Sequence, residues 1–147
     1  MKVADCGSSA GAAWRAKDGA LILGRAKQVL RVTPKGEVTI LADGFEEIFG
    51  VAQDARGRLY VSDWSRGEVV RLDGEKREVI AKGLQYPSGL AFDSKGRLYI
   101  KENGRMKNRD MIVRRLEADG KVTLFATIDS VSRWRKKKGE GAGQGRR

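Results

Sequence analysis

Short apolar segments of four to six residues alternate with turn sequences along most of the chain. Between residues 50 and 81 the segments are GVAQD, RLYVSD, EVVRL and REVIA, separated by turns such as WSRG and DGEK. The segments are rich in Val, Ile, Leu and Tyr, which favour strands, and the turns contain the Gly and Asp that favour tight reversals. Apolar residues at helical spacing are not sustained anywhere over about twelve residues. The pattern predicts an all-β protein.

The segments recur in three copies of one unit. Gly11, Gly50 and Gly89 are spaced 39 residues apart, and each opens a copy. The two most similar stretches are GVAQDARGRLYVSDW from residue 50 and GLAFDSKGRLYIKEN from residue 89. The third copy is longer by about five residues in GRMKNRDM, and an insertion confined to one place predicts a surface loop.

The second segment of each copy is apolar at consecutive positions, as in LIL, LYV and LYI. Such runs suit strands that are covered on both faces. A four-stranded unit of about forty residues that neighbouring units bury on both faces is typical of a β-propeller blade. We therefore predict three four-stranded antiparallel blades at about residues 11–49, 50–88 and 89–126, with a connection up to residue 132.

Positive charge is concentrated at the C-terminal end. The formal net charge is +11, and residues 133–147 hold seven Arg or Lys and one Glu, which leaves +5 for residues 1–132. This Gly-rich basic tail lacks apolar periodicity, which predicts a disordered segment. A solvated tail is the favoured interpretation, and a nucleic-acid contact in which Trp134 stacks on a base is the alternative. Residues 1–10 form a separate N-terminal segment before the repeats.

The composition excludes several kinds of chemistry. The chain has no histidine and one cysteine, Cys6, which excludes Ser-His-Asp and Cys-His catalysis, imidazole-bound zinc and an intrachain disulfide. No stretch has the length and hydrophobicity of a membrane span, and the N-terminus lacks the apolar core of a secretory signal. The compartment is left open, with the cytoplasm as the default expectation.

The pattern G-[LV]-A-x-D-x-x-G-R-L-Y-[VI], followed by a turn and x-V-x-R-[LV], resembles the NHL repeat and the blades of the senescence-marker-protein/gluconolactonase family. LYVSDW with RLDG is also similar to the YWTD blades of lipoprotein receptors, but the D-x-x-G-R-L-Y turn fits the first group better. The resemblance covers residues 11 to about 126 and implies part of a six-bladed propeller. Binding proteins and enzymes share such blades. We predict a binding or scaffolding module, with a metal-dependent gluconolactonase-like lactone hydrolase as the alternative.

The same resemblance implies where a metal would bind. In the lactonases a divalent metal at the mouth of the central channel is held by residues directly before the blade-opening glycines. Those positions are Ala10, Phe49 and Ser88 in this chain. Alanine and phenylalanine offer no side-chain oxygen to a hard cation such as calcium. We therefore expect no cofactor, and calcium or another divalent metal only under the lactonase alternative.

The loops that join successive blades and the loops after each second strand should emerge on one face. There the sequence places aromatic residues among arginines and amides, a combination typical of binding surfaces. The adjacent Glu46 and Glu47 in these loops are expected to be solvated rather than an acid–base pair. We expect a protein or small-molecule ligand at this face, and the candidate residues are Trp64, Arg66, Tyr86, Glu102, Asn103, Arg105, Asn108 and Asp110.

Acidic residues recur at two positions of the repeat. Asp54 and Asp93 lie in strand-to-strand turns, where Asp commonly binds backbone amides, so their predicted role is structural. Asp63 and Glu102 occur where the second strand ends, and the first copy has Arg25 there. A metal bridging the blades would need an acid in all three copies. Turn capping is therefore the favoured role of this pair.

Three blades are fewer than the four to eight of closed propellers. Each copy begins with its first strand and ends with its fourth, so both end blades would leave an apolar face in water. Two interpretations follow. The favoured one is a fragment of a longer six-bladed protein, and the other is half of a ring that a second copy closes about a two-fold axis.

Overall fold

The computed structural model describes residues 13–104 and 110–128. These residues form twelve β-strands in chain order. Their bounds are β1 Ala13–Arg15, β2 Leu21–Arg25, β3 Gln28–Val32, β4 Val38–Ala42, β5 Ile48–Gln53, β6 Leu59–Asp63, β7 Glu68–Asp73, β8 Lys76–Ala81, β9 Pro87–Phe92, β10 Leu98–Glu102, β11 Met111–Leu116 and β12 Val122–Ile128.

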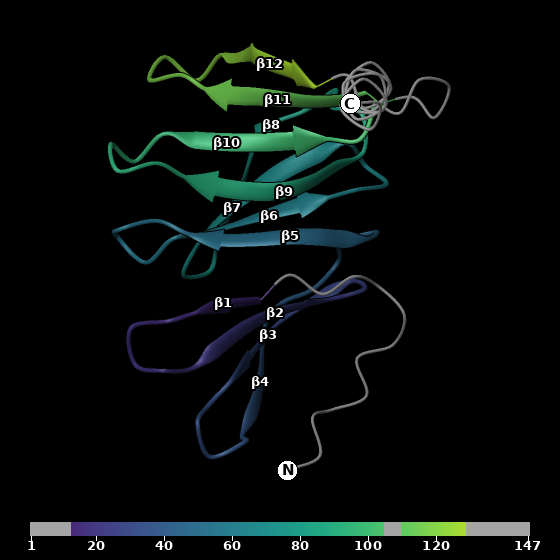
Figure 1. Cartoon of the computed structure of the whole chain (residues 1–147). Helices are drawn as coiled ribbons and strands as arrows, with labels where there is room; N and C mark the ends of the chain where they lie inside the picture. The colour runs from purple at the N-terminus through teal and green to yellow at the C-terminus, as the bar shows by residue number, and fades with distance from the viewer. Residues whose placement is uncertain (1–12, 105–109, 129–147) are drawn as a thin grey trace, which may run out of the picture.

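The strands form three antiparallel sheets, each made of four consecutive strands in chain order: β1–β4, β5–β8 and β9–β12. The sheets follow one another as separate layers in Figure 1. Each sheet begins with its first strand and ends with its fourth, as the repeat predicts. The prediction of an all-β chain with three four-stranded units is confirmed, and the sheets are called blades 1, 2 and 3 below.

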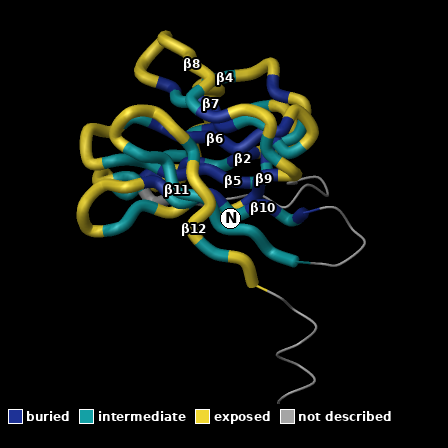
Figure 2. The backbone as a smooth tube through the Cα atoms, turned by 90° about the horizontal axis from the view of Figure 1, so that it is seen from above, coloured by how far each residue is buried: buried dark blue, intermediate teal, exposed yellow. Residues whose placement is uncertain are grey.

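Successive blades pack through their first and second strands. β5 lies against β1 and β2 of the preceding blade, and β9 lies against β5 and β6. The fourth strands lie at the outer edge, where β4, β8 and β12 are mostly exposed, while the strands nearer the middle are buried (Figure 2). The first strand of each blade is therefore the inner strand.

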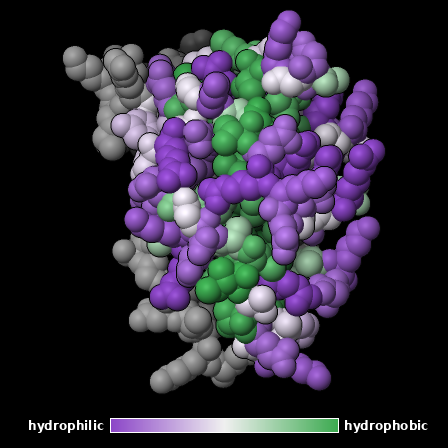
Figure 3. All heavy atoms as spheres, turned by 180° about the vertical axis from the view of Figure 1, so that it is seen from behind, coloured by the Kyte–Doolittle hydropathy of each residue, from purple (hydrophilic) through white to green (hydrophobic). Residues whose placement is uncertain are grey.

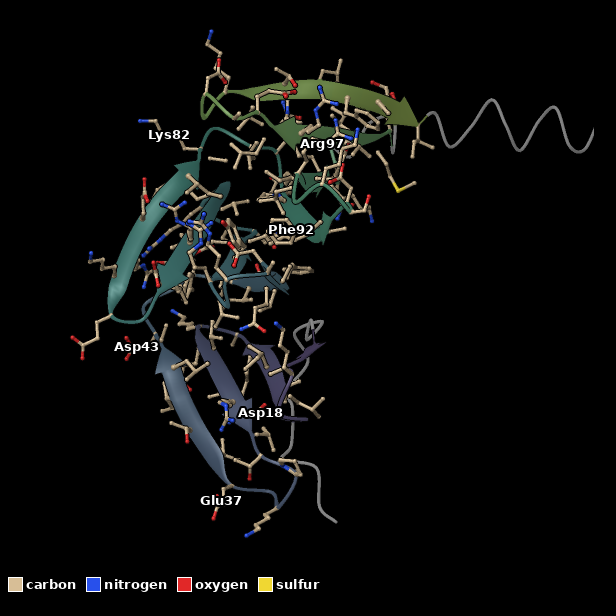
Figure 4. The ribbon with its side chains drawn as sticks, turned by 90° about the vertical axis from the view of Figure 1, so that its left-hand side faces the viewer. Asp18, Glu37, Asp43, Lys82, Phe92 and Arg97 are labelled. Atoms are coloured by element: carbon tan, nitrogen blue, oxygen red, sulfur yellow. The ribbon has the colours of Figure 1, made fainter. Side chains whose placement is uncertain are left out.

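A separate apolar core fills each of the two gaps between blades. Between blades 1 and 2 the buried side chains include Ile22, Ile48 and Val61. Between blades 2 and 3 Leu98 and Ile100 pack with Tyr60, and the ring of Tyr60 meets the edge of Phe92 at a centroid distance of 4.9 Å. Figure 4 shows Phe92 on the blade 3 side of this gap. Each blade is therefore stabilised chiefly by its neighbours.

The D-x-x-G-R-L-Y pattern forms one turn twice. Asp54 accepts hydrogen bonds from the amides of Arg56 and Arg58, from Arg58 Nε at 2.7 Å and from the Tyr60 hydroxyl at 3.1 Å. Asp93 repeats this arrangement at the second site, with Arg97 and Tyr99 in the roles of Arg58 and Tyr60. The structural role predicted for Asp54 and Asp93 is confirmed.

The predicted blade boundaries differ from the strand bounds by about two residues. Gly50 and Gly89 are the third residues of β5 and β9 rather than the first, and β12 continues through Ile128, beyond the predicted end at residue 126. The shift arises because the apolar residues before each glycine, such as Ile48, already pair with the second strand. The N-terminal segment 1–10 and the tail 133–147 lie outside the described residues. No helix long and apolar enough to cross a membrane occurs in the described part of the chain.

Candidate binding face

One edge of the stack collects the loops in which binding residues were predicted. β5 begins beside the end of β6, where Ile48 pairs with Asp63, and β9 begins beside the end of β10, where Pro87 pairs with Glu102. This edge lies at the right of Figure 1, and we call it the loop face. It holds the blade connections 43–47 and 82–86 and the turn 64–67. The loops of the described part therefore gather as predicted.

Three aromatic side chains form a continuous stack on the loop face. Phe49 stacks on Trp64 with ring centroids 4.3 Å apart, and Trp64 meets Tyr86 at 5.0 Å with the rings tilted by 37°. They come from β5, from the turn after β6 and from the connection to β9, and we call them the aromatic ledge. Tyr86 is 43% exposed, and Phe49 and Trp64 are half-buried. The ledge thus presents π surface to solvent.

The backbone holds Tyr86 in an unusual conformation. Its φ of 53° lies in the left-handed region, which costs a non-glycine residue roughly 1 kcal/mol. The Asn103 amide donates to the Tyr86 carbonyl oxygen at 3.2 Å. One residue earlier, the Gln85 amide donates to the Glu102 carboxylate at 2.8 Å. These contacts from blade 3 fix Tyr86 beside Trp64.

A buried carboxylate, that of Asp63, holds the turn that carries Trp64. Asp63 is fully buried and accepts hydrogen bonds from the amides of Glu46 at 2.8 Å, Glu47 at 3.2 Å and Arg66 at 3.3 Å. In turn, the Trp64 amide donates to the Glu47 carbonyl oxygen at 2.8 Å. Asp63 therefore ties the connection entering blade 2 to the turn that carries Trp64, which confirms its predicted capping role.

Glu102 plays the same part in blade 3, and its assignment to the exposed binding face is wrong. The residue is fully buried, binds the Gln85 amide and forms an ion pair with Arg114. Blade 1 has Arg25 at this position, and that side chain is exposed. The repetition of an acid at the end of the second strand in blades 2 and 3, from which turn capping was predicted, was the signal of an internal role, since a buried carboxylate needs partners.

A close approach of two loops brings Trp64 and Tyr86 together. Gly67 ends the turn after β6 with a φ of 66°, and the Leu84 amide donates to its carbonyl oxygen at 3.0 Å. A methyl group on Gly67 would lie 2.4 Å from the Leu84 carbonyl oxygen. A glycine is therefore required for the turn and the connection to meet.

Charged groups surround the ledge. Arg66 lies 3.3 Å from Glu46 and 3.9 Å from the buried Asp63, and Ser65 Oγ donates to the Glu47 carboxylate at 2.9 Å. Glu46 is exposed and paired rather than only solvated. The loops that carry Trp64 thus hold the carboxylates of Glu46, Glu47 and Asp63 close to the guanidinium of Arg66.

The remaining predicted binding residues stand as follows. Asn103 and Asp110, which lie before and after residues 105–109, are half-buried, so the base of this loop belongs to the loop face. Arg105 and Asn108 lie outside the described residues.

Comparison with known proteins identifies the architecture. No known protein family and no curated protein matches the chain by sequence. A catalytically inactive virginiamycin B lyase from Staphylococcus aureus matches its structure with a TM-score of 0.64 at 19% identity, over 85% of this chain and 44% of the lyase. A chain of a nidogen–laminin complex matches with a TM-score of 0.66 at 18% identity, over 78% of this chain and 46% of that one.

A gluconolactonase from Xanthomonas campestris matches with a TM-score of 0.66 at 20% identity, over 82% of this chain and 47% of the enzyme. These structures are β-propellers. The chain has a β-propeller fold. It spans somewhat less than half the length of each of the three structures. At these identities the likeness establishes the propeller alone.

The positions at which the lactonase resemblance places a metal do not fit one. Phe49 belongs to the aromatic ledge, and Ser88 is buried with its Oγ 3.5 Å from the Lys101 carbonyl oxygen. Ala10 lies outside the described residues. Within residues 13–104 and 110–128 no group of three or more Cys, Asp or Glu side chains could hold a metal ion.

The sequence did not predict a groove at the edge of the propeller opposite the loop face. A groove of about 570 Å³ lies between blades 1 and 2, and the turns at residues 16–18 and 53–57 line it. Asp18 and Arg31 form an ion pair in it, and the Ala20 amide and Arg31 hold the pKa of Asp18 below its ordinary value. Figure 4 shows Asp18 on blade 1. No sequence signal marks the groove, because it arises where two blades diverge.

Proposed function

We propose that this propeller is a binding module and that the aromatic ledge is its contact surface. The observation that supports the proposal is the stack of Phe49, Trp64 and Tyr86. Its residues come from two loops and one strand. The buried carboxylates of Asp63 and Glu102 hold these loops in place through hydrogen bonds to backbone amides. Rigid, partly exposed aromatic residues are the usual anchors of binding surfaces. A surface that is ordered before binding loses little conformational entropy when it binds.

The surroundings of the ledge favour a cationic group on the ligand. Aromatic faces attract cations through their quadrupoles, and Trp gives the strongest such contact. Glu46 and Glu47 lie in the connection beside Trp64. Arg66 pairs with Glu46, and the Glu47 carboxylate accepts a hydrogen bond from Ser65 Oγ. We therefore propose a protein ligand that presents an Arg or Lys side chain to the ledge.

Capped tripeptides with a central Arg, Lys, Phe or Glu are suitable probes. Their binding can be followed by nuclear magnetic resonance through the indole N–H signals and, in variants that lack Trp64, through the backbone amide signals of the loop face. We expect saturable shifts of the Trp64 signal with the Arg and Lys peptides, and none with the Glu peptide. The substitution Trp64→Ala should weaken binding about threefold to tenfold, since a cation–π contact contributes roughly 0.5–2 kcal/mol.

Val79→Ala is the matched control, because Val79 is an exposed apolar residue on the outer strand β8. It should leave peptide binding unchanged. Equal affinity for the Arg and Glu peptides, or an equal effect of the two substitutions, would contradict the proposal.

A lactone hydrolase is the second candidate, supported by the structural likeness to the Xanthomonas gluconolactonase. Because Phe49 and Ser88 do not fit a metal, no catalytic step is derived for it. Calorimetric titration of the whole chain with calcium, manganese and zinc tests the point, followed by assays of gluconolactone hydrolysis with each metal. Stoichiometric binding with metal-dependent hydrolysis would establish the lactonase instead of the binding module.

A further inference from the structure

The two interfaces inside the propeller pair the same two faces of a blade. Side chains alternate along a strand, so β6 directs Leu59 and Val61 toward blade 1, and Tyr60 and Ser62 toward blade 3. We call the face toward the preceding blade the leading face and the opposite one the trailing face. Each interface thus places the trailing face of one blade on the leading face of the next.

Blade 1 has a leading face on which no described blade packs. The register of β2, β3 and β4 places six aliphatic side chains on it in adjacent pairs. Of these, Leu21 is 40%, Val38 52% and Ile40 56% exposed. Leu23 and Val32 are half-buried, and Leu30, between them and Ile40, is 6% exposed. Figure 3, seen from behind, shows a further hydrophobic band that runs along the stack of blades between hydrophilic atoms. An aliphatic face of this kind marks an association site.

Blade 3 has an uncovered trailing face. Tyr99 packs against the edge of Phe125 at 4.9 Å, and Arg115 lies 5.6 Å from the Phe125 ring. Beside them a shallow hollow of about 260 Å³ is lined by residues 89–91, Tyr99, Lys101 and Val113. At the equivalent place on blade 2, the inner strand of blade 3 fills the space.

Glycine 89 indicates that something packs closely on this face. At the equivalent position of blade 2, a methyl group on Gly50 would lie 2.0 Å from the Ser88 carbonyl oxygen, so the inner strand of the next blade requires a glycine there. Gly89 is exposed, its φ is not positive, and a methyl group would meet only the Lys101 side chain, at 3.6 Å. Its own described surroundings do not require a glycine, whereas a blade packed on blade 3 would.

We propose that the occupant is a second copy of this chain, with blade 3 of each copy receiving blade 1 of the other. The two uncovered faces are the two halves of an interface that the chain already forms twice. One partner therefore covers both. Closed propellers have about four to eight blades, and among whole multiples of three only two copies fall in that range. A two-fold axis gives two identical contacts and a closed ring.

Lys101 differs from its counterparts and provides a sharp test. Blades 1 and 2 have Gly24 and Ser62 at this position, and Ser62 Oγ donates to the Ser88 carbonyl oxygen at 2.7 Å across the interface. The Lys101 side chain lies over Gly89 and must move aside when a blade packs there. Lysine is depleted at interface centres. Lys101→Ser should therefore strengthen association.

Sedimentation of the full chain over a range of concentrations tests the proposal. We expect a reversible dimer with the mass of two chains. Gly89→Ala and Ile40→Glu should each weaken it about tenfold or more while leaving the circular dichroism spectrum unchanged, and Lys101→Ser should tighten it at least about threefold.

Three results would overturn the proposal. A folded monomer for both the natural chain and Lys101→Ser would exclude a second copy, and would leave further blades of a longer chain as the occupant. A ladder of trimers and longer assemblies would show that the contact does not close. A dimer that Gly89→Ala and Ile40→Glu leave intact would use other surfaces. None of these results depends on what binds the aromatic ledge.

Discussion

The second strands of blades 2 and 3 have similar sequences and different surroundings. All five residues of β6 are buried, whereas burial alternates along β10, and it alternates along β2 of blade 1 too. LYV and LYI are almost the same sequence, so composition does not explain the difference. The neighbours do, because β6 has a blade on both faces and β10 has one on a single face. An apolar run indicates that a strand is suited to burial on both faces. Whether both faces are buried depends on the neighbouring blades.

The largest expected difference in stability is between alanine substitutions at two equivalent glycines, Gly50 and Gly89. Gly50→Ala should lower the free energy of unfolding by about 3 kcal/mol or more, because the added methyl group meets backbone at 2.0 Å. Gly89→Ala should cost less than about 1 kcal/mol, because its methyl group meets a flexible side chain at ordinary contact distance. Urea denaturation of dilute samples measures both. Similar losses in the two variants would mean that the faces of blades 2 and 3 are equally filled.

A smaller difference in stability is expected between alanine substitutions at Asp63 and Arg25, the last residues of the second strands of blades 2 and 1. Asp63→Ala leaves the amides of Glu46, Glu47 and Arg66 without their acceptor and should cost about 2–3 kcal/mol. Arg25→Ala, at the same position of blade 1, should change the free energy of unfolding by less than about 0.5 kcal/mol. Urea denaturation serves here too, with the Trp64 signal as a local probe. A cost at Arg25 equal to that at Asp63 would show that blade 1 has an anchor of its own.

The smallest effect concerns pH. The Arg97 amide and guanidinium, the Lys95 amide and the Tyr99 hydroxyl lower the pKa of Asp93 to about 2 from 3.8, although partial desolvation opposes them. Because the carboxylate is favoured in the folded state, its contribution is complete above pH 3.8 and is lost as the pH falls through about 2. Asp93→Asn should therefore flatten the pH dependence of stability between about pH 4 and 2. A carboxyl signal of Asp93 that titrates near its ordinary pKa would contradict this assignment.

The repeat predicted the fold well because its signals are local. The spacing of Gly50 and Gly89, the D-x-x-G-R-L-Y turn and four short apolar segments per copy depend on neighbouring residues, and all three blades follow from them. The starts of β5 and β9 were placed about two residues late, because the glycine is conspicuous and the pairing of Ile48 with Asp63 is not visible in the sequence.

The candidate site was predicted less completely, because it depends on contacts between distant segments. Trp64 and Tyr86 were both named, but the stack that joins them through Phe49 requires the register of two blades. Glu102 was placed on the surface because its partner, the Gln85 amide, lies 17 residues away in the connection from the previous blade. An acidic side chain is assigned to solvent unless such a partner is known.

The turn around Asp54 also has a consequence for the order of folding. Its bonds to Arg58 and Tyr60 span four and six residues, so closing them costs little loop entropy compared with the pairing of separate blades. The hairpins built on Asp54 and Asp93 are therefore expected to form early, before any blade has a neighbour. Substitutions in these turns should slow folding, whereas substitutions such as Gly50→Ala at a blade interface should mainly speed unfolding. The hairpins within a blade would thus form first, and packing of one blade on the next would complete folding.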